Sequence, residues 1–223
     1  MSIEKNELLS RRLLKVYSLI PSCETVVDVG SDHGKLGAFC LMTEKCRNLI
    51  ATDIHEQPAQ RTRLFLEGAG FGQKAQVLHT DGLKGVDLSK DATVVIAGMG
   101  GLEMIKILSS AKDEGKILPG MYMVLQPQRS FEVLRAYLCE SGFSIEEEAI
   151  ELEKGHFYVA MRVMYKGKPY ALSDAQLFLG PYILEKKPDL FSEYMEHEKK
   201  LLEKRALGDP RCREILLNWE KWI

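Results

Sequence analysis

The stretch VVDVGSDHGKLG, residues 26–37, decides the fold class of this chain. Its short, valine-rich run is typical of a buried strand; the run ends after Asp28 and passes into a turn that contains Gly30 and Gly34. Nucleotide-binding α/β domains begin with such a strand, a glycine-rich turn and a helix. The stretch therefore predicts a sheet whose first strand-to-helix turn contacts a nucleotide-like ligand.

Strand and helix patterns alternate along the chain on both sides of this turn. Five apolar, β-branched runs of strand length are separated by helical patterns. They occupy residues 25–29, 48–53, 75–80, 92–98 and 121–127. Residues 143–165 predict two further strands around a Lys154–Gly155 turn, which is a hairpin rather than another crossover. We therefore expect an α/β fold with a mostly parallel sheet of seven strands and one antiparallel strand in the C-terminal hairpin.

Both ends of the chain have helical patterns. Residues 4–20 predict an amphipathic helix that ends before Pro21. The tail is charged and helical in pattern, and Asp209-Pro210 divides it into two predicted helices. We expect one domain over residues 1–167 and a small helical domain over residues 168–223.

Composition excludes several classes of protein. The 223 residues are 45% hydrophobic and 28% charged, as in ordinary soluble domains, and no apolar run reaches the ~18 residues of a membrane span. The N-terminus lacks the layout of a signal peptide. The five cysteines are scattered without a CxxC pair, which argues against a zinc site or a disulfide framework. We expect a cytoplasmic protein with reduced thiols and no metal, and we favour a monomer.

The first turn departs from the fingerprint of a dinucleotide site. That fingerprint needs a second glycine where this chain has Asp32, because the backbone must approach a pyrophosphate. A carboxylate would repel a pyrophosphate, but it suits a cationic ligand. S-adenosylmethionine has a sulfonium and an ammonium and no phosphate, so we favour it over a nicotinamide cofactor.

Two further acids follow the next two strands. Asp53 would suit the ribose hydroxyls, and Asp81, followed by Gly82, would suit the adenine amine. Acids at such positions also act as simple helix caps, so each one alone is a weak indication. Together with Asp28 and Asp32 they indicate the carboxyl edge of a sheet that binds a methyl donor.

The fourth strand ends in AGMGG, residues 97–101. This segment lacks the Asn/Asp-Pro-Pro-aromatic motif of enzymes that methylate exocyclic amines, and no cysteine nucleophile lies near it. What remains is direct attack by an available lone pair, as on adenine N1, which needs positioning rather than a strong base. Asp32 or Asp81 could stabilise the cationic product, and the glycines would let backbone approach an aromatic base. Close packing of helix on sheet is the alternative reason for Gly100 and Gly101, and an N-cap is the alternative role of His33.

These motifs, in this order, resemble those of the bacterial tRNA (adenine(22)-N1)-methyltransferase family. The segments are LSRRLLKVYSLIP, DVGSDHGKL, IAGMGG, LQPQ, EKGHFY and LGPYILEKKPDLF, and they extend over nearly the whole chain. The resemblance implies a class I, Rossmann-like methyltransferase domain and a C-terminal helical, coiled-coil-like domain. It also implies S-adenosylmethionine as methyl donor and N1 of an adenine in tRNA as acceptor.

The resemblance also implies roles for individual residues. The implied cofactor-binding residues are Asp28, Gly30, Ser31, Asp32, His33, Asp53, Ile54, Asp81, Gly82, Ala97, Gly98, Met99 and Gly100. Among them, the candidates for the catalytic groups are Asp32, His33 and Met99. The chain departs from the family pattern at Lys35, where we expect tyrosine, and at Gln128, where we expect asparagine.

Basic residues in three segments are candidates for contacts to RNA phosphates, because affinity depends on phosphates neutralised locally rather than on the net charge of -2. They are Arg11, Arg12, Lys15, Arg129, Lys199 and Lys200. Three other functions remain open at this point: a methyltransferase for a small molecule or another RNA base, a nicotinamide-dependent oxidoreductase, and a non-catalytic RNA-binding protein.

Overall fold

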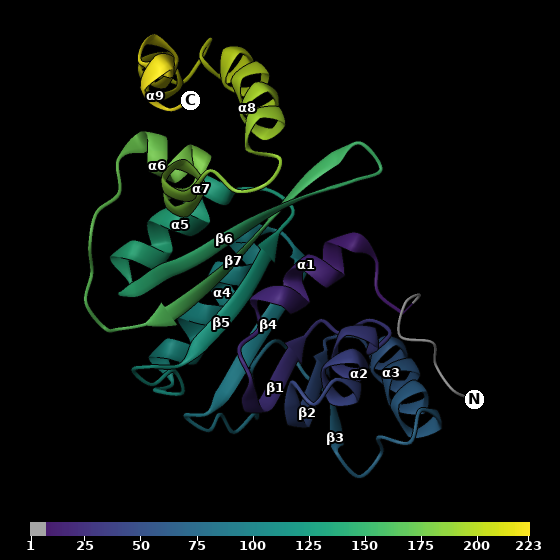
Figure 1. Cartoon of the computed structure of the whole chain (residues 1–223). Coiled ribbons are helices and arrows are strands. Elements are labelled where there is room, and N and C mark those ends of the chain that lie inside the picture. Colours follow the sequence, from purple (N-terminus) through teal and green to yellow (C-terminus); the bar gives the residue numbers. More distant parts are fainter. Residues whose placement is uncertain (1–7) are drawn as a thin grey trace.

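The computed structural model describes residues 8–223, and seven strands in that range form one sheet (Figure 1). The strands are β1 (Cys23–Val29), β2 (Cys46–Asp53), β3 (Ala75–His79), β4 (Ala92–Met99), β5 (Tyr122–Pro127), β6 (Phe143–Glu153) and β7 (His156–Tyr165). Their order in the sheet is β3-β2-β1-β4-β5-β7-β6. Strand β7 runs antiparallel to both of its neighbours, whereas β1 to β5 pair in parallel. The predicted fold class is confirmed.

The strand order reverses in the middle of the sheet. The chain runs from β1 outward through β2 to β3, and then returns to place β4 on the other side of β1. The connections after β1 and β4 therefore leave in opposite directions. In an open parallel sheet, a crevice forms at such a switch point outside the carboxyl ends of the strands. This is the edge where the sequence places its glycines and acids.

Helices cover both faces of the sheet. Helices α1 (Arg11–Leu19), α2 (Lys35–Met42) and α3 (Glu56–Gly68) pack on one face, and α4 (Gly101–Asp113) and α5 (Phe131–Glu140) pack on the other. Alternate strand residues supply the two cores: Val26 lies in the first and Val27 in the second. A strand buried on both faces is mostly apolar, which explains the valines on either side of Asp28.

Helix α1 begins later than the sequence predicts. Ser10 caps it by accepting a hydrogen bond from the backbone N–H of Leu13 at 3.3 Å, so residues 8–10 precede the helix. The part of the predicted helix over residues 4–7 lies outside the described residues. In the described part, no helix is long and apolar enough to span a membrane.

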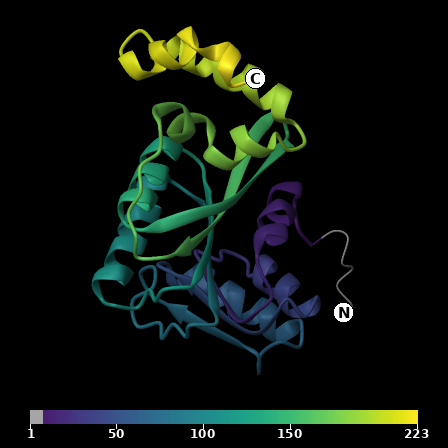
Figure 2. The same cartoon turned by 60° about the vertical axis from the view of Figure 1, so that its left-hand side comes forward.

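The tail contains four α-helices rather than the two that the sequence predicts. They are α6 (Asp174–Leu179), α7 (Pro181–Lys186), α8 (Phe191–Arg205) and α9 (Pro210–Leu217). The additional breaks occur at Gly180, which has a φ of 100°, and at Leu190, which has a φ of 67°. Since a helix requires negative φ, a positive value interrupts it. The four helices share a core of their own with the β6–β7 hairpin and lie beyond it in Figure 2.

A buried ion pair joins the tail to the sheet domain. Arg135 on α5 places Nε and Nη2 each 2.8 Å from Oε1 of Glu148 on β6, and both side chains have 0% exposure. Arg135 Nη1 also donates to the carbonyl of Leu177 at 2.8 Å. Glu148 Oε2 accepts from the backbone N–H of Tyr182 at 3.0 Å. One charge pair thereby fixes the end of α6 and the start of α7.

The ion pair yields a stability prediction. Replacing Arg135→Met leaves the Glu148 carboxylate buried without its partner, which should lower the free energy of unfolding by about 3–5 kcal/mol. The double variant Arg135→Met with Glu148→Gln removes both charges and keeps an oxygen for the α7 backbone, so it should recover most of that loss. Chemical denaturation of the three proteins measures both steps. Equal stability of the single and the double variant would contradict this account.

Candidate active site

Two cavities lie at the carboxyl ends of the central strands, on either side of Gly30. The first, of about 260 Å³, is called here the Asp53 cavity, and the second, of about 270 Å³, the Asp28 cavity. The Asp53 cavity is lined by residues that include Gly30, Asp53, Ile54, Asp81, Gly82 and Met99. The Asp28 cavity is lined by residues that include Arg12, Asp28, Gly30, Ser31, Asp32, His33, Lys35, Ala97 and Gly98. The predicted cofactor residues thus form two adjoining groups, and Gly100 follows them in the chain.

Met99 lies at the boundary of the two cavities. Gly30 has a φ of 72°, and a Cβ built on it would lie 2.2 Å from the methyl carbon of Met99. A side chain at position 30 would therefore collide with Met99 and would also strain the backbone. The thioether of Met99 fills the space that a side chain would take, next to the point where the cavities meet.

The acids of the Asp53 cavity are held by the turns that carry them. Asp53 is only 8% exposed, and its Oδ1 accepts a hydrogen bond from the backbone N–H of His55 at 2.9 Å. Asp81 is more exposed and pairs with Lys84, whose Nζ lies 2.6 Å from its Oδ2. Both acids line one cavity, as expected for residues at the ends of neighbouring strands.

Asp28 differs from the other acids because it is almost fully buried. It is 4% exposed and accepts a backbone hydrogen bond from Gly37. Burial raises the pKa of Asp28 from 3.8 to about 7, because a carboxylate loses its hydration there. Near neutral pH this group can either donate or accept a hydrogen bond toward a ligand.

The Asp32 loop is held by helix α3. The Asp32 carboxylate lies 3.4 Å from Nη2 of Arg61 and 3.5 Å from Nε2 of His33. The backbone carbonyl of Asp32 accepts a hydrogen bond from the hydroxyl of Thr62 at 3.0 Å. Sequence reasoning missed Arg61 and Thr62, since they lie about thirty residues further along the chain. The catalytic roles of Asp32, His33 and Met99 stay predictions.

The turn after β4 is fixed to the turn after β5. The backbone N–H of Gln128 donates to Met99 O at 2.8 Å, and that of Gly101 donates to Arg129 O at 3.0 Å. A Cβ on Gly101 would lie 2.6 Å from the carbonyl oxygen of Ser130. Close packing of two backbones therefore requires glycine at position 101.

Arg12 reaches the Asp28 cavity from helix α1. Its Nη1 donates to Oε1 of Gln126 at 2.6 Å, and its Cζ lies 5.7 Å from the centroid of the Tyr158 ring. Gln126 is 1% exposed, and its amide also donates to Pro127 O at 2.8 Å. Sequence reasoning missed Gln126 and Tyr158, although a glutamine at the end of an apolar strand is a signal that could have found the first.

The other basic residues have different surroundings. Arg11 Nη2 lies 2.9 Å from Glu151 Oε1, and Lys15 Nζ lies 3.8 Å from Glu151 Oε2. Lys199 Nζ lies 5.6 Å from the centroid of the Trp219 ring, and Lys200 is exposed. Their contacts to RNA stay predictions. Among residues 8–223, no group of three or more His, Cys, Asp or Glu side chains is arranged to hold a metal ion.

Comparisons with known proteins point to one family. The family described as "Methyltransferase domain" matches residues 9–161. Over 208 residues, the chain is 28% identical to the tRNA (adenine(22)-N(1))-methyltransferase of Bacillus subtilis. The matched segment covers 89% of this chain and 86% of that protein. The resemblance that the motifs indicated is thereby confirmed.

Solved structures agree with the sequence match. The Streptococcus pneumoniae protein Sp1610 in complex with S-adenosyl-L-methionine is 28% identical, with a TM-score of 0.80 over 93% of this chain and 99% of that chain. The m1A22 tRNA methyltransferase of B. subtilis is 25% identical, with a TM-score of 0.77 over 96% of this chain and 97% of that chain. The similarity extends to the helices of the tail, since the matches cover nearly all of both chains.

The burial of Asp28 yields a prediction on pH dependence. The folded protein holds the Asp28 proton more tightly than the unfolded chain, whose carboxyl keeps a pKa near 3.8. The contribution of this group to stability therefore falls as pH rises from about 4 to about 7 and is lost above that window. The side chain at position 28 of the Asp28→Asn variant cannot ionise. The free energy of unfolding of this variant, minus that of wild type, should therefore be larger at about pH 8 than at about pH 4. Denaturation without ligand at both pH values measures this, and an unchanged difference would refute it.

Proposed function

Since the chain belongs to the methyltransferase domain family, we propose that it transfers a methyl group from S-adenosylmethionine to N1 of an adenine in tRNA. The observation that carries the proposal is the similarity to the B. subtilis tRNA (adenine(22)-N(1))-methyltransferase over 89% of this chain. The acceptor is therefore the adenine at position 22. Family membership also sets aside the nicotinamide-dependent oxidoreductase.

The two cavities fit the parts of S-adenosylmethionine. The adenosine belongs in the Asp53 cavity, where Asp53 accepts from the ribose hydroxyls and Asp81 from the adenine amine. The amino-acid end belongs in the Asp28 cavity, whose carboxyl groups complement an ammonium. Gly30 lines both cavities, so the two parts of the ligand adjoin there. When bound, the cofactor supplies a methyl group on a sulfonium.

The chain positions the acceptor rather than activating it. Adenine N1 carries an available lone pair, so alignment with the methyl group is the main requirement. Arg12 is held by Gln126 and Tyr158 at the edge of the Asp28 cavity, and a planar guanidinium stacks well on a purine. Arg12 thereby supplies a flat surface on which the base can stack. Lys35, which stands where we expect tyrosine, cannot supply one. The carboxylate of Asp32, in the same cavity, stabilises the positive charge that develops on the base.

A direct test of the function is to incubate the protein with methyl donor and unmodified bacterial tRNA and to analyse the nucleosides by mass spectrometry. We expect 1-methyladenosine at position 22, as in the B. subtilis relative. A product on another base or on a small molecule would favour a different methyltransferase. Absence of methylation, with tRNA bound, would favour a non-catalytic RNA-binding protein.

Arg11 and Arg12 form a matched pair of neighbours with different predicted roles. Arg12→Lys keeps the charge but loses the planar group held by Gln126, so kcat/KM for tRNA should fall at least about 10-fold. Arg11→Lys keeps a cation beside Glu151 and should change kcat/KM by less than about 2-fold. Methylation kinetics measure both variants, and binding of S-adenosylhomocysteine checks that the cofactor site is intact. Equal effects of the two changes would disprove the assignment.

A further inference from the structure

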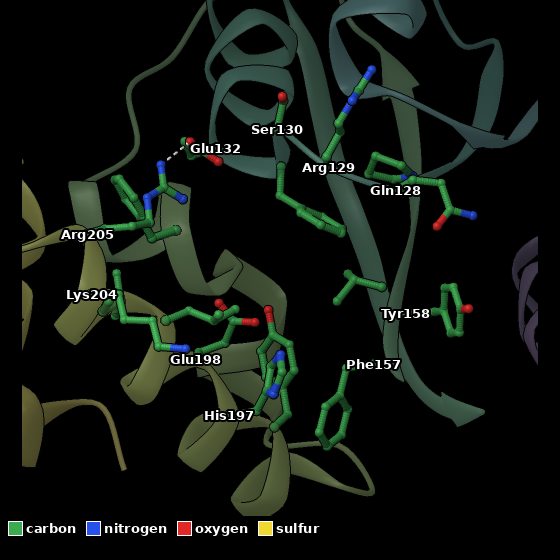
Figure 3. Close-up of a pocket in the computed structure, with 17 residues that line it drawn as sticks. Gln128, Arg129, Ser130, Glu132, Phe157, Tyr158, His197, Glu198, Lys204 and Arg205 are labelled. Atoms are coloured by element: carbon green, nitrogen blue, oxygen red, sulfur yellow. Dashed lines mark hydrogen bonds and ion pairs between the residues drawn. The ribbon is translucent and has the colours of Figure 1, made fainter. Parts of the chain in front are cut away.

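A third and larger cavity lies between the sheet domain and helix α8 (Figure 3). This α8 cleft measures about 660 Å³, which is within the size range of ligand sites. Its walls come from the turn after β5, the start of β7 and α8. The residues that matter for its chemistry are Arg129, Phe157, Tyr194, His197, Glu198 and Lys204. None of the cofactor positions lines it.

Aromatic side chains form one wall of the α8 cleft. The Phe157 ring centroid lies 5.2 Å from that of His197 and 5.8 Å from that of Tyr194. Burial and nearby cations lower the pKa of His197, so its ring is neutral at neutral pH and behaves as an aromatic surface. Phe157 packs with the core of the tail, whereas its neighbour Tyr158 contacts Arg12. Both rings line the α8 cleft, so strand β7 supplies it with two aromatic side chains.

Glu198 supplies a carboxyl group to this cleft. Among the described residues no hydrogen bond or ion pair to its side chain is present, because Arg135 is paired with Glu148 and Arg205 with Glu132. Burial raises the pKa of Glu198 to about 7. A partly buried carboxyl without a partner is free to bond the amine and ring nitrogen on the edge of a nucleobase.

A cation lies beside Glu198 on the same wall. Lys204 lines the α8 cleft, and Lys200 belongs to the same helix. Lys200 is exposed, and Figure 3 shows the Lys204 amine extending toward Glu198. An aromatic surface edged by a carboxyl acceptor and an ammonium group matches a nucleotide, whose base stacks and whose phosphate is anionic.

The α8 cleft is also adjacent to the acceptor site. Its residues Gln128 and Arg129 hydrogen-bond to the turn after β4 through Met99 O and Gly101 N–H. The strands β4 and β5 are neighbours in the sheet, and strands in a sheet are about 4.8 Å apart. A strand of RNA with one base against Arg12, at the edge of the Asp28 cavity, can therefore place a neighbouring nucleotide in the α8 cleft.

We propose that the α8 cleft is a second nucleobase site, which binds a nucleotide next to the methylated adenine by stacking on Phe157 and hydrogen bonding to Glu198. This inference rests on the proposed function, because it takes RNA as the substrate. With the acceptor adenine on one side and the second base on the other, the RNA strand is held on both sides of the wall formed by Gln128 and Arg129. The second base aligns the acceptor adenine without contacting the reacting atoms, so these are positioning residues.

Removal of single bases from the RNA tests the proposal. Fluorescence anisotropy measures the affinity of wild type, Phe157→Leu and Glu198→Gln for tRNA that lacks the base on one side of the target adenine. For wild type, loss of the base on one of the two sides should weaken binding about 10-fold. The variant Phe157→Leu keeps an apolar side chain in the core but has no ring on which the base can stack. Removal of the same base should therefore change the affinity of this variant less than about 2-fold, because the base and the ring act through one contact.

Controls separate this site from the cofactor site and from general charge effects. Glu196→Gln removes a carboxylate from an exposed position on the same helix and should leave the affinity for intact tRNA and the abasic effect as in wild type. All variants should bind S-adenosylhomocysteine like wild type.

Two outcomes would overturn the inference. In the first, removal of the base on either side weakens tRNA binding equally for wild type and for Phe157→Leu. In the second, removal of the base weakens tRNA binding of neither protein. Since binding is measured without methyl transfer, failure of the proposed function appears separately, as absence of 1-methyladenosine with wild type.

Discussion

The buried ion pair between Arg135 and Glu148 is the contact on which the arrangement of the two parts of this molecule depends. Two opposite charges without exposed surface are costly to desolvate, and further hydrogen bonds to both side chains offset part of that cost. The carbonyl of Leu177 and the N–H of Tyr182 supply such partners, and they belong to the tail. If the tail shifted along the sheet domain, the charged pair would lose these two backbone partners. The pair therefore fixes the position of the tail on the sheet domain.

A second constraint acts at the carboxyl ends of the strands. The turns after β4 and β5 approach so closely that Gly101 has no room for a side chain, whereas at Gly30 the end of the flexible Met99 side chain occupies the space. These contacts make the edge of the sheet rigid while leaving cavities on both sides of it. Rigid backbone with free space is what a methyl transfer to a ring nitrogen requires, because alignment replaces acid–base chemistry.

Charge alone is a poor guide to the residues that meet a substrate. Arg11, Arg12 and Lys15 look equivalent in the sequence, yet two of them are paired with Glu151 on β6. Arg12 instead lines the Asp28 cavity, because the turn of the helix directs it toward Gln126 and Tyr158. Both partners lie more than a hundred residues further along the chain than Arg12, so no local pattern relates them to it.

The sequence by itself determined the fold class and the family, and it predicted which strand-end residues bind the cofactor. These follow from local patterns: the valine run before Asp28, the glycines after it, and acids at successive strand ends. Only the tertiary structure decided the four-helix form of the tail, the partners of Arg12 and the α8 cleft. Short helices broken at Gly180 leave little periodicity, and contacts such as Arg135 with Glu148 are made across the fold. Periodicity reports which residues are buried, whereas the identity of their partners depends on packing between elements that are distant in the chain.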